Sequence, residues 1–139
     1  MSNEHKKEYL RGYQRAKYDL KRAEEDLEEY KTHILYPSTL FDSMPKGSGG
    51  KGDLSRYMGK LEELKKKYLK RRYKAVQKAK EIKDCIDRLE HPEEREVLVL
   101  RYIEGRKWEL LAEEMDEHLT QVHRFHGRAL QKLKIPEKL

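Results

Sequence analysis

Two groups of residues in this 139-residue sequence have the types and spacings that metal or catalytic sites use. His118, His123 and His126 could bind zinc, but no cysteine or nearby carboxylate completes a ligand set. Paired acids such as Glu113 and Glu114 could serve in acid–base catalysis, but they belong to an amphipathic helical pattern with no sign of a cleft. We therefore predict that the protein is not an enzyme and that it binds neither a metal ion nor another cofactor.

A glycine-rich stretch offers a third kind of chemistry, the binding of phosphate by a loop. The segment KGSGGKGD at 46–53 superficially resembles a nucleotide-binding loop. It lacks the G-x-x-x-x-G-K-[ST] spacing, and no strand pattern precedes it. We interpret it as the second half of a Gly/Pro-rich loop over residues 35–53 that joins two helices.

The composition favours long helices over a wide core, because 42% of the residues are charged and 36% are hydrophobic, with a mean hydropathy of −1.11. The net charge of +6 is distributed unevenly: basic excesses over 53–91 and 118–139 flank an acidic segment over 92–117. The basic run KKKYLKRRYK at 65–74 is either a solvated helix surface or a phosphate-binding surface without sequence preference. No apolar run is long enough for a membrane span or a leader, so we expect a cytoplasmic protein. Its single cysteine, Cys85, cannot form an intrachain disulfide and is expected to be buried.

Two long helices are predicted in the first two thirds of the sequence. The first, over residues 3–34, follows from apolar side chains that recur at alternating spacings of three and four. This stripe consists of Tyr9, Tyr13, Ala16, Leu20, Ala23, Leu27, Tyr30 and Ile34. The second helix begins at Asp53, a residue type that caps helix N-termini, and extends to about His91. Its apolar face consists of Leu54, Tyr57, Met58, Leu61, Leu64, Tyr68, Ala75, Ala79, Ile82, Ile86 and Leu89.

These narrow stripes predict an antiparallel, coiled-coil-like hairpin, because neither helix can be stable alone. The first half of the second helix is the simplest partner for the first helix. Its remaining length must pack on either a second protomer or the C-terminal module, and we favour a second protomer. Residues 1–91 are therefore predicted to form a hairpin that assembles the protein into a homo-oligomer, most simply a dimer.

Three shorter amphipathic segments follow Pro92 and complete a prediction of an all-α fold. The first covers residues 93–104 and is closed by Gly105, a residue type common just after helices. The second covers residues 107–115, and a four-residue turn leads into the third, over 120–133. A short helix, a tight turn and a longer helix with polar and basic outward residues indicate a helix-turn-helix, in which the longer helix fits the major groove of DNA.

About 40 residues near the C-terminal end also resemble a known family. The segment EREVLVLRYIEGRKWELLAEEMDEHLTQVHRFHGRALQKL is similar to region 4 of bacterial sigma factors, the part that reads the promoter −35 element. The motifs that carry the resemblance are E-R-E-V-L-x-L-R-Y, W-x-x-L-A-x-x-M and R-A-L-x-K-L. The whole architecture resembles sigma-region-4-like regulators of phages and prophages, among them the ArpU/RinA type. This resemblance implies that residues 92–139 form a DNA-binding domain.

The resemblance further implies a set of DNA contacts. On the exposed face of the recognition helix, Gln121 and Arg124 are expected to form bidentate hydrogen bonds with adenine and guanine. Arg128 and Lys132, farther along, are expected to contact backbone phosphates. The predicted DNA-binding residues are Arg106, Lys107, Thr120, Gln121, His123, Arg124, Arg128 and Lys132. His118 occupies the position where sigma factors usually have a capping Ser or Thr, so we expect a weaker or shifted cap.

Three hypotheses about function remain open from the sequence. We favour a sequence-specific transcriptional regulator of phage type, active in the cytoplasm of a bacterial host, that reads double-stranded promoter DNA and contacts RNA polymerase through its acidic segment. The second is a structural or interaction protein that binds RNA polymerase or a phage component without reading DNA sequence. The third is a DNA-packaging subunit similar to the terminase small subunits, although these usually have the helix-turn-helix first in the chain.

Overall fold

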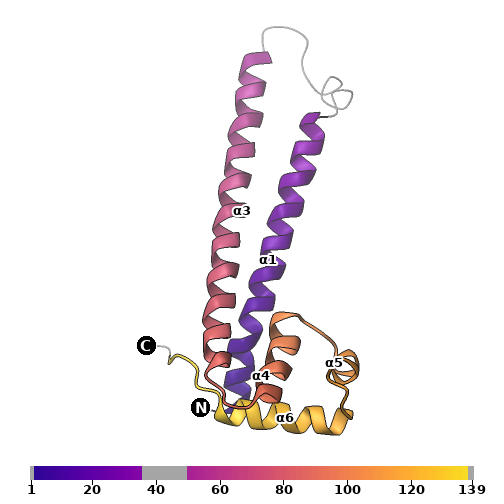
Figure 1. Cartoon of the computed structure of the whole chain (residues 1–139). Coiled ribbons are helices and arrows are strands. Elements are labelled where there is room, and N and C mark those ends of the chain that lie inside the picture. Colours follow the sequence, from indigo (N-terminus) through magenta and orange to yellow (C-terminus); the bar gives the residue numbers. More distant parts are fainter. Residues whose placement is uncertain (1, 36–49, 138–139) are drawn as a thin grey trace. The chain divides into compact units, whose positions relative to one another are not determined.

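The computed structural model of the protein describes the backbone of residues 2–35 and 50–137, and the side chains of residues 2–32 and 54–137. In these ranges the chain is all-helical, without strands, as predicted (Figure 1). The elements are α1 (Asn3–Leu35), α3 (Gly50–Asp87), α4 (Pro92–Leu98), the π-helical segment η1 (Val99–Ile103), α5 (Trp108–Met115) and α6 (Leu119–Lys132). Among the described helices, none combines the length and the apolar character that a membrane crossing requires.

The ends of the second long helix differ from the prediction. Helix α3 begins before Asp53, which therefore lies inside the helix and not at its cap, and it ends at Asp87 instead of near His91. The predicted loop over 35–53 is thus shorter at both ends, and the rest of it lies outside the described residues. Pro92 starts a new helix. Proline has no backbone N–H, and at the first position of a helix that group would have no partner within the helix.

The chain divides into two compact units. We call the first the core unit, which comprises Met1–Ala16 together with Ala75–Leu139, and the second the hairpin unit, which comprises Lys17–Lys74. The predicted division into a hairpin over residues 1–91 and a DNA-binding domain over 92–139 stays a prediction.

The core unit has a continuous apolar interior to which the start of α1 and the end of α3 both contribute. Leu10 is fully buried there, although the predicted stripe of the first helix did not include it. Ile82 and Ile86 are fully buried in the same cluster, and Cys85 is buried beside them as predicted. The C-terminal helices supply the other members, which are Leu89, Val97, Leu98, Leu100, Tyr102, Leu111, Ala112, Val122, Phe125, Ala129, Leu130 and Leu133.

The last turns of α3 are therefore covered by their own chain. Lys78 places its ammonium group 4.9 Å from the ring centroid of Tyr9, so the second half of α3 meets the start of α1. For the length of the second helix beyond its first half, we favour a second protomer as the cover. The structure instead agrees with the alternative, in which the C-terminal module packs on the end of this helix.

Contacts within the hairpin unit run antiparallel. The Tyr30 and Tyr57 rings have centroids 6.2 Å apart, and the Tyr30 hydroxyl lies 3.3 Å from the backbone oxygen of Tyr57, to which it donates. Farther along, Arg71 donates through Nη1 to the backbone oxygen of Asp19 at 3.1 Å. As the position moves back along α1 from Tyr30 to Asp19, the contact on α3 moves forward from Tyr57 to Arg71, as the predicted antiparallel hairpin requires.

Most of the side chains described in the hairpin unit, over residues 17–32 and 54–74, are open to solvent. Ala23 and Leu27 are buried, but Leu54 and Met58 are exposed although we placed both on the apolar face of α3. Among the described residues of this unit, the exposed large apolar side chains are Tyr18, Leu54, Met58, Leu69 and Tyr73. Two helices leave such positions uncovered because each can bury only one stripe against the other.

Candidate nucleic-acid interface

The tight turn between α5 and α6 sets the geometry of the interface. Asp116 follows α5 in the left-handed conformation, with φ of 54°, and its N–H bonds back to the carbonyls of the last turn. The Glu117 N–H donates to the Ala112 carbonyl at 3.0 Å, which satisfies another free acceptor of α5. The predicted helix-turn-helix is therefore present, with α6 beginning at Leu119 and α5 at Trp108, each within one residue of the prediction.

The segment predicted as one helix over 93–104 is an α-helix that widens into the π-helical η1. The Glu104 N–H donates to the Val99 carbonyl at 3.0 Å, five residues back, and Gly105 then reverses the chain with φ of +68°. The predicted role of Gly105 is confirmed by this conformation, which other residues adopt only with strain. Nε2 of Gln14, from α1, donates to the carbonyl oxygens of Tyr102 and Ile103 at 3.1 and 2.9 Å. A side chain distant in sequence thus provides hydrogen-bond donors for two carbonyl groups at the end of η1.

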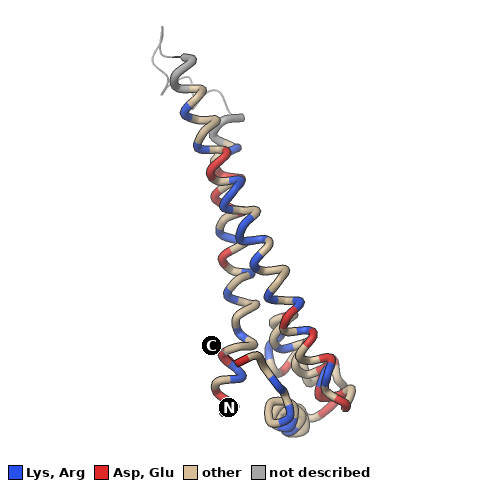
Figure 2. The backbone as a smooth tube through the Cα atoms, turned by 90° about the vertical axis from the view of Figure 1, so that its left-hand side faces the viewer, with Lys and Arg blue, Asp and Glu red and all other residues tan. Residues whose placement is uncertain are grey.

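Helix α6 has one buried and one exposed face. Its buried residues include Val122, Phe125, Ala129 and Leu130, whose spacing places them on one side of the helix. Among the predicted DNA-binding residues of this helix, Gln121 is half-buried, and Thr120, His123, Arg124, Arg128 and Lys132 are exposed. The helix carries Lys and Arg and no Asp or Glu (Figure 2). An exposed face of this charge is one that phosphate groups can approach without like-charge repulsion.

Trp108 connects α5 to α6 and to η1. Its ring centroid lies 4.6 Å from that of His123 and 4.8 Å from that of His126, and the Arg101 guanidinium lies 4.6 Å above the same ring. His123 is therefore both exposed and packed on the indole ring, which fixes how its imidazole can meet a ligand. Trp108 itself is partly buried against the core cluster.

His126, one of the three histidines considered above as zinc ligands, is buried. Its Nε2 lies 2.8 Å from the Tyr102 hydroxyl. Burial, and then the nearby charges of Lys7, His123 and Arg101, lower the pKa of His126 from 6.5 to about 4, so its imidazole is neutral at pH 7. In the sequence, the signal for this burial is that His126 follows Val122 by four residues and precedes Ala129 by three, which places it on the inward face of α6. No cluster of three potential metal ligands occurs in the described part of the chain.

The two predicted contacts before α5 lie outside the helix, because α5 begins at Trp108. Arg106 is exposed and forms ion pairs with Glu104, at 3.2 Å, and with Glu114, at 3.1 Å. Lys107 is exposed at the N-cap position of α5. Arg106 is thus already partly neutralised by carboxylates.

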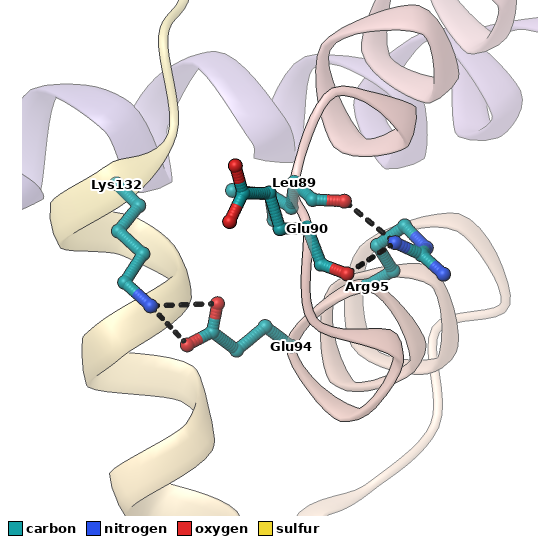
Figure 3. A network of polar contacts seen from close by, with 5 residues as sticks. All are labelled: Leu89, Glu90, Glu94, Arg95 and Lys132. Atoms are coloured by element: carbon teal, nitrogen blue, oxygen red, sulfur yellow. Dashed lines mark hydrogen bonds and ion pairs between the residues drawn. The ribbon is translucent and has the colours of Figure 1, made fainter.

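Lys132 is also engaged, in a network that joins α4 to α6 (Figure 3). Its Nζ lies 3.0 Å from Oε1 of Glu94, whose side chain is 3% exposed. On the other side of this network, Arg95 donates through Nη1 to the carbonyl oxygens of Leu89 and Glu90 at 2.6 and 3.1 Å, which ties the turn after α3 to α4. The ammonium group predicted to contact a phosphate therefore balances a buried carboxylate.

The start of α6 lacks a side-chain cap. His118 is the N-cap residue, with φ of −68° and ψ of 147°, and its side chain makes no capping hydrogen bond. The absence agrees with the expected weak cap and leaves N–H groups of the first turn pointing out of the helix end.

Comparison with protein families agrees with this geometry. Residues 85–134 match the family model described as Sigma-70, region 4, which is a DNA-binding and not a catalytic domain family. The matched range starts near the end of α3 and includes α4, η1, α5 and α6. A search of curated proteins found no match, and a search of solved structures found none either.

Proposed function

With a Sigma-70 region 4 helix-turn-helix at residues 85–134 as the premise, we propose that the protein is a sequence-specific transcriptional regulator of phage type. It uses α6 to read promoter DNA in the major groove. The observation that carries the proposal is the coincidence of a DNA-binding family with an α6 whose outward face is polar and basic and has no acidic residue.

Base reading is assigned to the first two turns of α6. Arg124 is exposed and can donate two hydrogen bonds to a guanine, and Gln121 can pair in the same way with an adenine. Thr120 is exposed one residue earlier, where its methyl and hydroxyl groups suit a thymine methyl or a phosphate. His123, held on the indole of Trp108, completes this surface with a side chain of restricted orientation.

Phosphate contacts are assigned unequally among the other cations. Arg128 and Lys107 are exposed and make no ion pair within the described residues, so they contribute most to counterion release. Arg106 and Lys132 must exchange a carboxylate for a phosphate, and their net contribution to affinity is therefore smaller.

The acidic side chains of α5 and the following turn are assigned to RNA polymerase. Glu109, Glu113 and Glu117 are exposed, whereas α6 has no acid, so the two charge signs occupy separate elements of the helix-turn-helix. A protein that holds DNA with one element and a basic protein surface with another needs such a separation.

Dimerisation is assigned to the hairpin unit. Leu69 and Tyr73 are exposed on α3, and Leu54 and Met58 are exposed on the same helix nearer its start. Burial of these side chains in a second copy would double the DNA site through effective concentration. Half-site spacing in the selected DNA, together with sedimentation of the free protein, tests this part.

The test is a random-sequence DNA selection with the full chain at about 150 mM salt, repeated with Arg124→Ala and Arg128→Ala. We expect a defined motif that loses information at one position in Arg124→Ala. The matched control, Arg128→Ala, removes a charge from the same helix and should weaken all sequences equally while the motif persists. A motif unchanged by Arg124→Ala would refute the assignment of base reading to α6.

A structural or assembly role is the second candidate, and one observation favours it. Two of the predicted phosphate-binding cations, Arg106 and Lys132, are held by carboxylates. On this reading the helix-turn-helix is a protein-binding module, for RNA polymerase or for a terminase-like packaging complex. Selection that yields no motif, with weak salt dependence of DNA binding, would favour this candidate.

A further inference from the structure

The core unit contains a surface pocket that the proposed function does not use. It has a volume of about 350 Å³, within the range of small-ligand sites. Its walls come from α1, η1, α5 and α6, and the residues that concern us are Lys7, Arg11, Arg101, Trp108 and His126. Lys7 and Arg11 lie far outside the matched range 85–134, so the pocket is a property of this chain and not of the family alone.

The pocket concentrates positive charge. Lys7, Arg11 and Arg101 line it, and no Asp or Glu does. Lys7 pairs with Glu4 at 3.1 Å, but Arg11 and Arg101 form no ion pair in the residues that the structure describes. Cations that share a concave surface without counter-charges raise the local potential and attract an anion. His126 responds to the same field, since the charges of Lys7, Arg101 and Arg11 add to burial in lowering its pKa.

One of the two arginines is held in place. The Arg101 guanidinium stacks 4.6 Å above the Trp108 ring, and its Nη1 donates to the backbone oxygen of Arg106 at 2.9 Å. A guanidinium fixed in this way loses little entropy on binding and keeps further N–H groups for a ligand. Arg11 is exposed on α1 and can close over the same ligand.

We propose that this pocket binds a phosphate group through Arg11 and Arg101. Arginine forks match the oxygens of phosphate in charge and in geometry, and the two arginines without an ion pair in the described residues can balance a dianion. The phosphate comes either from a free phosphorylated small molecule or from the DNA backbone beside α6. The second source rests on the proposed function, and it is within reach because Trp108 contacts both His126 in the pocket and the exposed His123.

The sole tryptophan of the chain, Trp108, provides a direct readout. The full chain is titrated with inorganic phosphate at constant ionic strength, with chloride as the reference anion, and the fluorescence is recorded. For a free phosphorylated ligand we expect a saturable change, and a dissociation constant raised about tenfold in Arg11→Gln. Arg22→Gln is the matched control, because it removes the same charge from an exposed position of α1 outside the pocket and should leave binding unchanged. Arg101→Gln, checked for folding by circular dichroism, should repeat the Arg11→Gln result.

A second arm separates the two sources. The salt dependence of DNA affinity is measured for the same variants, and a slope reduced by about one in Arg11→Gln but not in Arg22→Gln identifies a DNA phosphate as the ligand. The proposal is overturned if phosphate gives no saturable signal and Arg11→Gln matches Arg22→Gln in the salt slope. Saturable phosphate binding by a protein that selects no DNA motif would instead refute the proposed function and leave the pocket assignment intact.

Discussion

The core unit and the hairpin unit each contain part of the two long helices α1 and α3, yet they bury the side chains of these helices very differently. In the core unit Leu10, Ile82 and Ile86 are fully buried, because the C-terminal helices supply surfaces on several sides. In the hairpin unit the buried apolar side chains among those described are Ala23 and Leu27. The difference shows that an apolar stripe encloses large side chains only when more than one partner helix is present. The hairpin unit is accordingly the part whose stability depends most on further contacts.

The largest expected effect tests this contrast directly. Leu111→Ala in the core unit should lower the free energy of unfolding by about 3–4 kcal/mol, because a fully enclosed cavity remains. Leu27→Ala in the hairpin unit should cost about 2 kcal/mol, since solvent and neighbouring side chains can fill the open site. Urea denaturation of both variants measures the two values, and equal costs would break the comparison.

Acid should destabilise the core unit through His126. Its pKa is about 4 in the folded protein against 6.5 without the fold, so the unfolded chain binds more protons between these values. The contribution of neutral His126 to the free energy of unfolding is therefore fully present above pH 6.5. It is lost as the pH drops from 6.5 to 4, which lowers the free energy of unfolding by up to about 3 kcal/mol. Lys7, Arg11 and Arg101 lie around the imidazole and oppose its protonation.

The control for this pH effect is His126→Gln, which keeps a polar side chain beside Tyr102 but does not titrate. Unfolding free energies of both proteins are compared between pH 7.5 and pH 4, so that the carboxylates common to both cancel. The same slope in both proteins would show that His126 is not the group responsible.

Ion pairs of the two units should differ in a smaller but measurable way. Lys132→Ala leaves the buried carboxylate of Glu94 without its ammonium partner and should cost about 2 kcal/mol. Lys60→Ala breaks a solvent-exposed pair with Glu63 in the hairpin unit and should cost less than about 0.5 kcal/mol. Thermal and urea unfolding of the two variants give the difference, and a neutral Lys132→Ala would contradict the role assigned to the pair.

The smallest effect is a gain in stability. His118→Ser provides a hydroxyl that can accept a hydrogen bond from the first turn of α6, where the natural side chain makes none. We expect about 1 kcal/mol of stabilisation, which would sharpen the contrast by showing that even the better packed unit retains an unsatisfied helix end. His118→Ala serves as the control without a cap, and it should not be stabilised.

Much of the helix-turn-helix could be predicted because its signals are local. The spacing of Val122, Phe125 and Leu130 defined the inward face of α6, and Gly105 marked the turn before α5. The resemblance to sigma region 4, later matched over 85–134, depended on the same short motifs. Each of these signals lies within a few residues of the element that it specifies.

The contributions of distant residues could not be predicted in the same way. Leu10 is not part of the regular stripe of α1, and its burial depends on helices more than 70 residues farther along the chain. Lys132 has a composition and spacing that suit a phosphate contact, and nothing local to it indicates the pairing with Glu94. In both cases a contact with a remote element, burial for Leu10 and an ion pair for Lys132, decides the role of the side chain. The assignment of individual residues of the helix-turn-helix to DNA contacts stays a prediction.

The two hydrogen bonds from Gln14 to the end of η1 set a condition for anyone who wishes to transplant this module. A graft cut at the limits of the family match would carry the recognition helix but leave behind Gln14 and the apolar plug of Leu10. In the recipient protein the carbonyl groups of Tyr102 and Ile103 would lack the Gln14 donor, and the apolar residues that Leu10 covers would be exposed to solvent. A chimaera that joins residues 1–16 through a linker to residues 75–139 would instead carry the whole core unit.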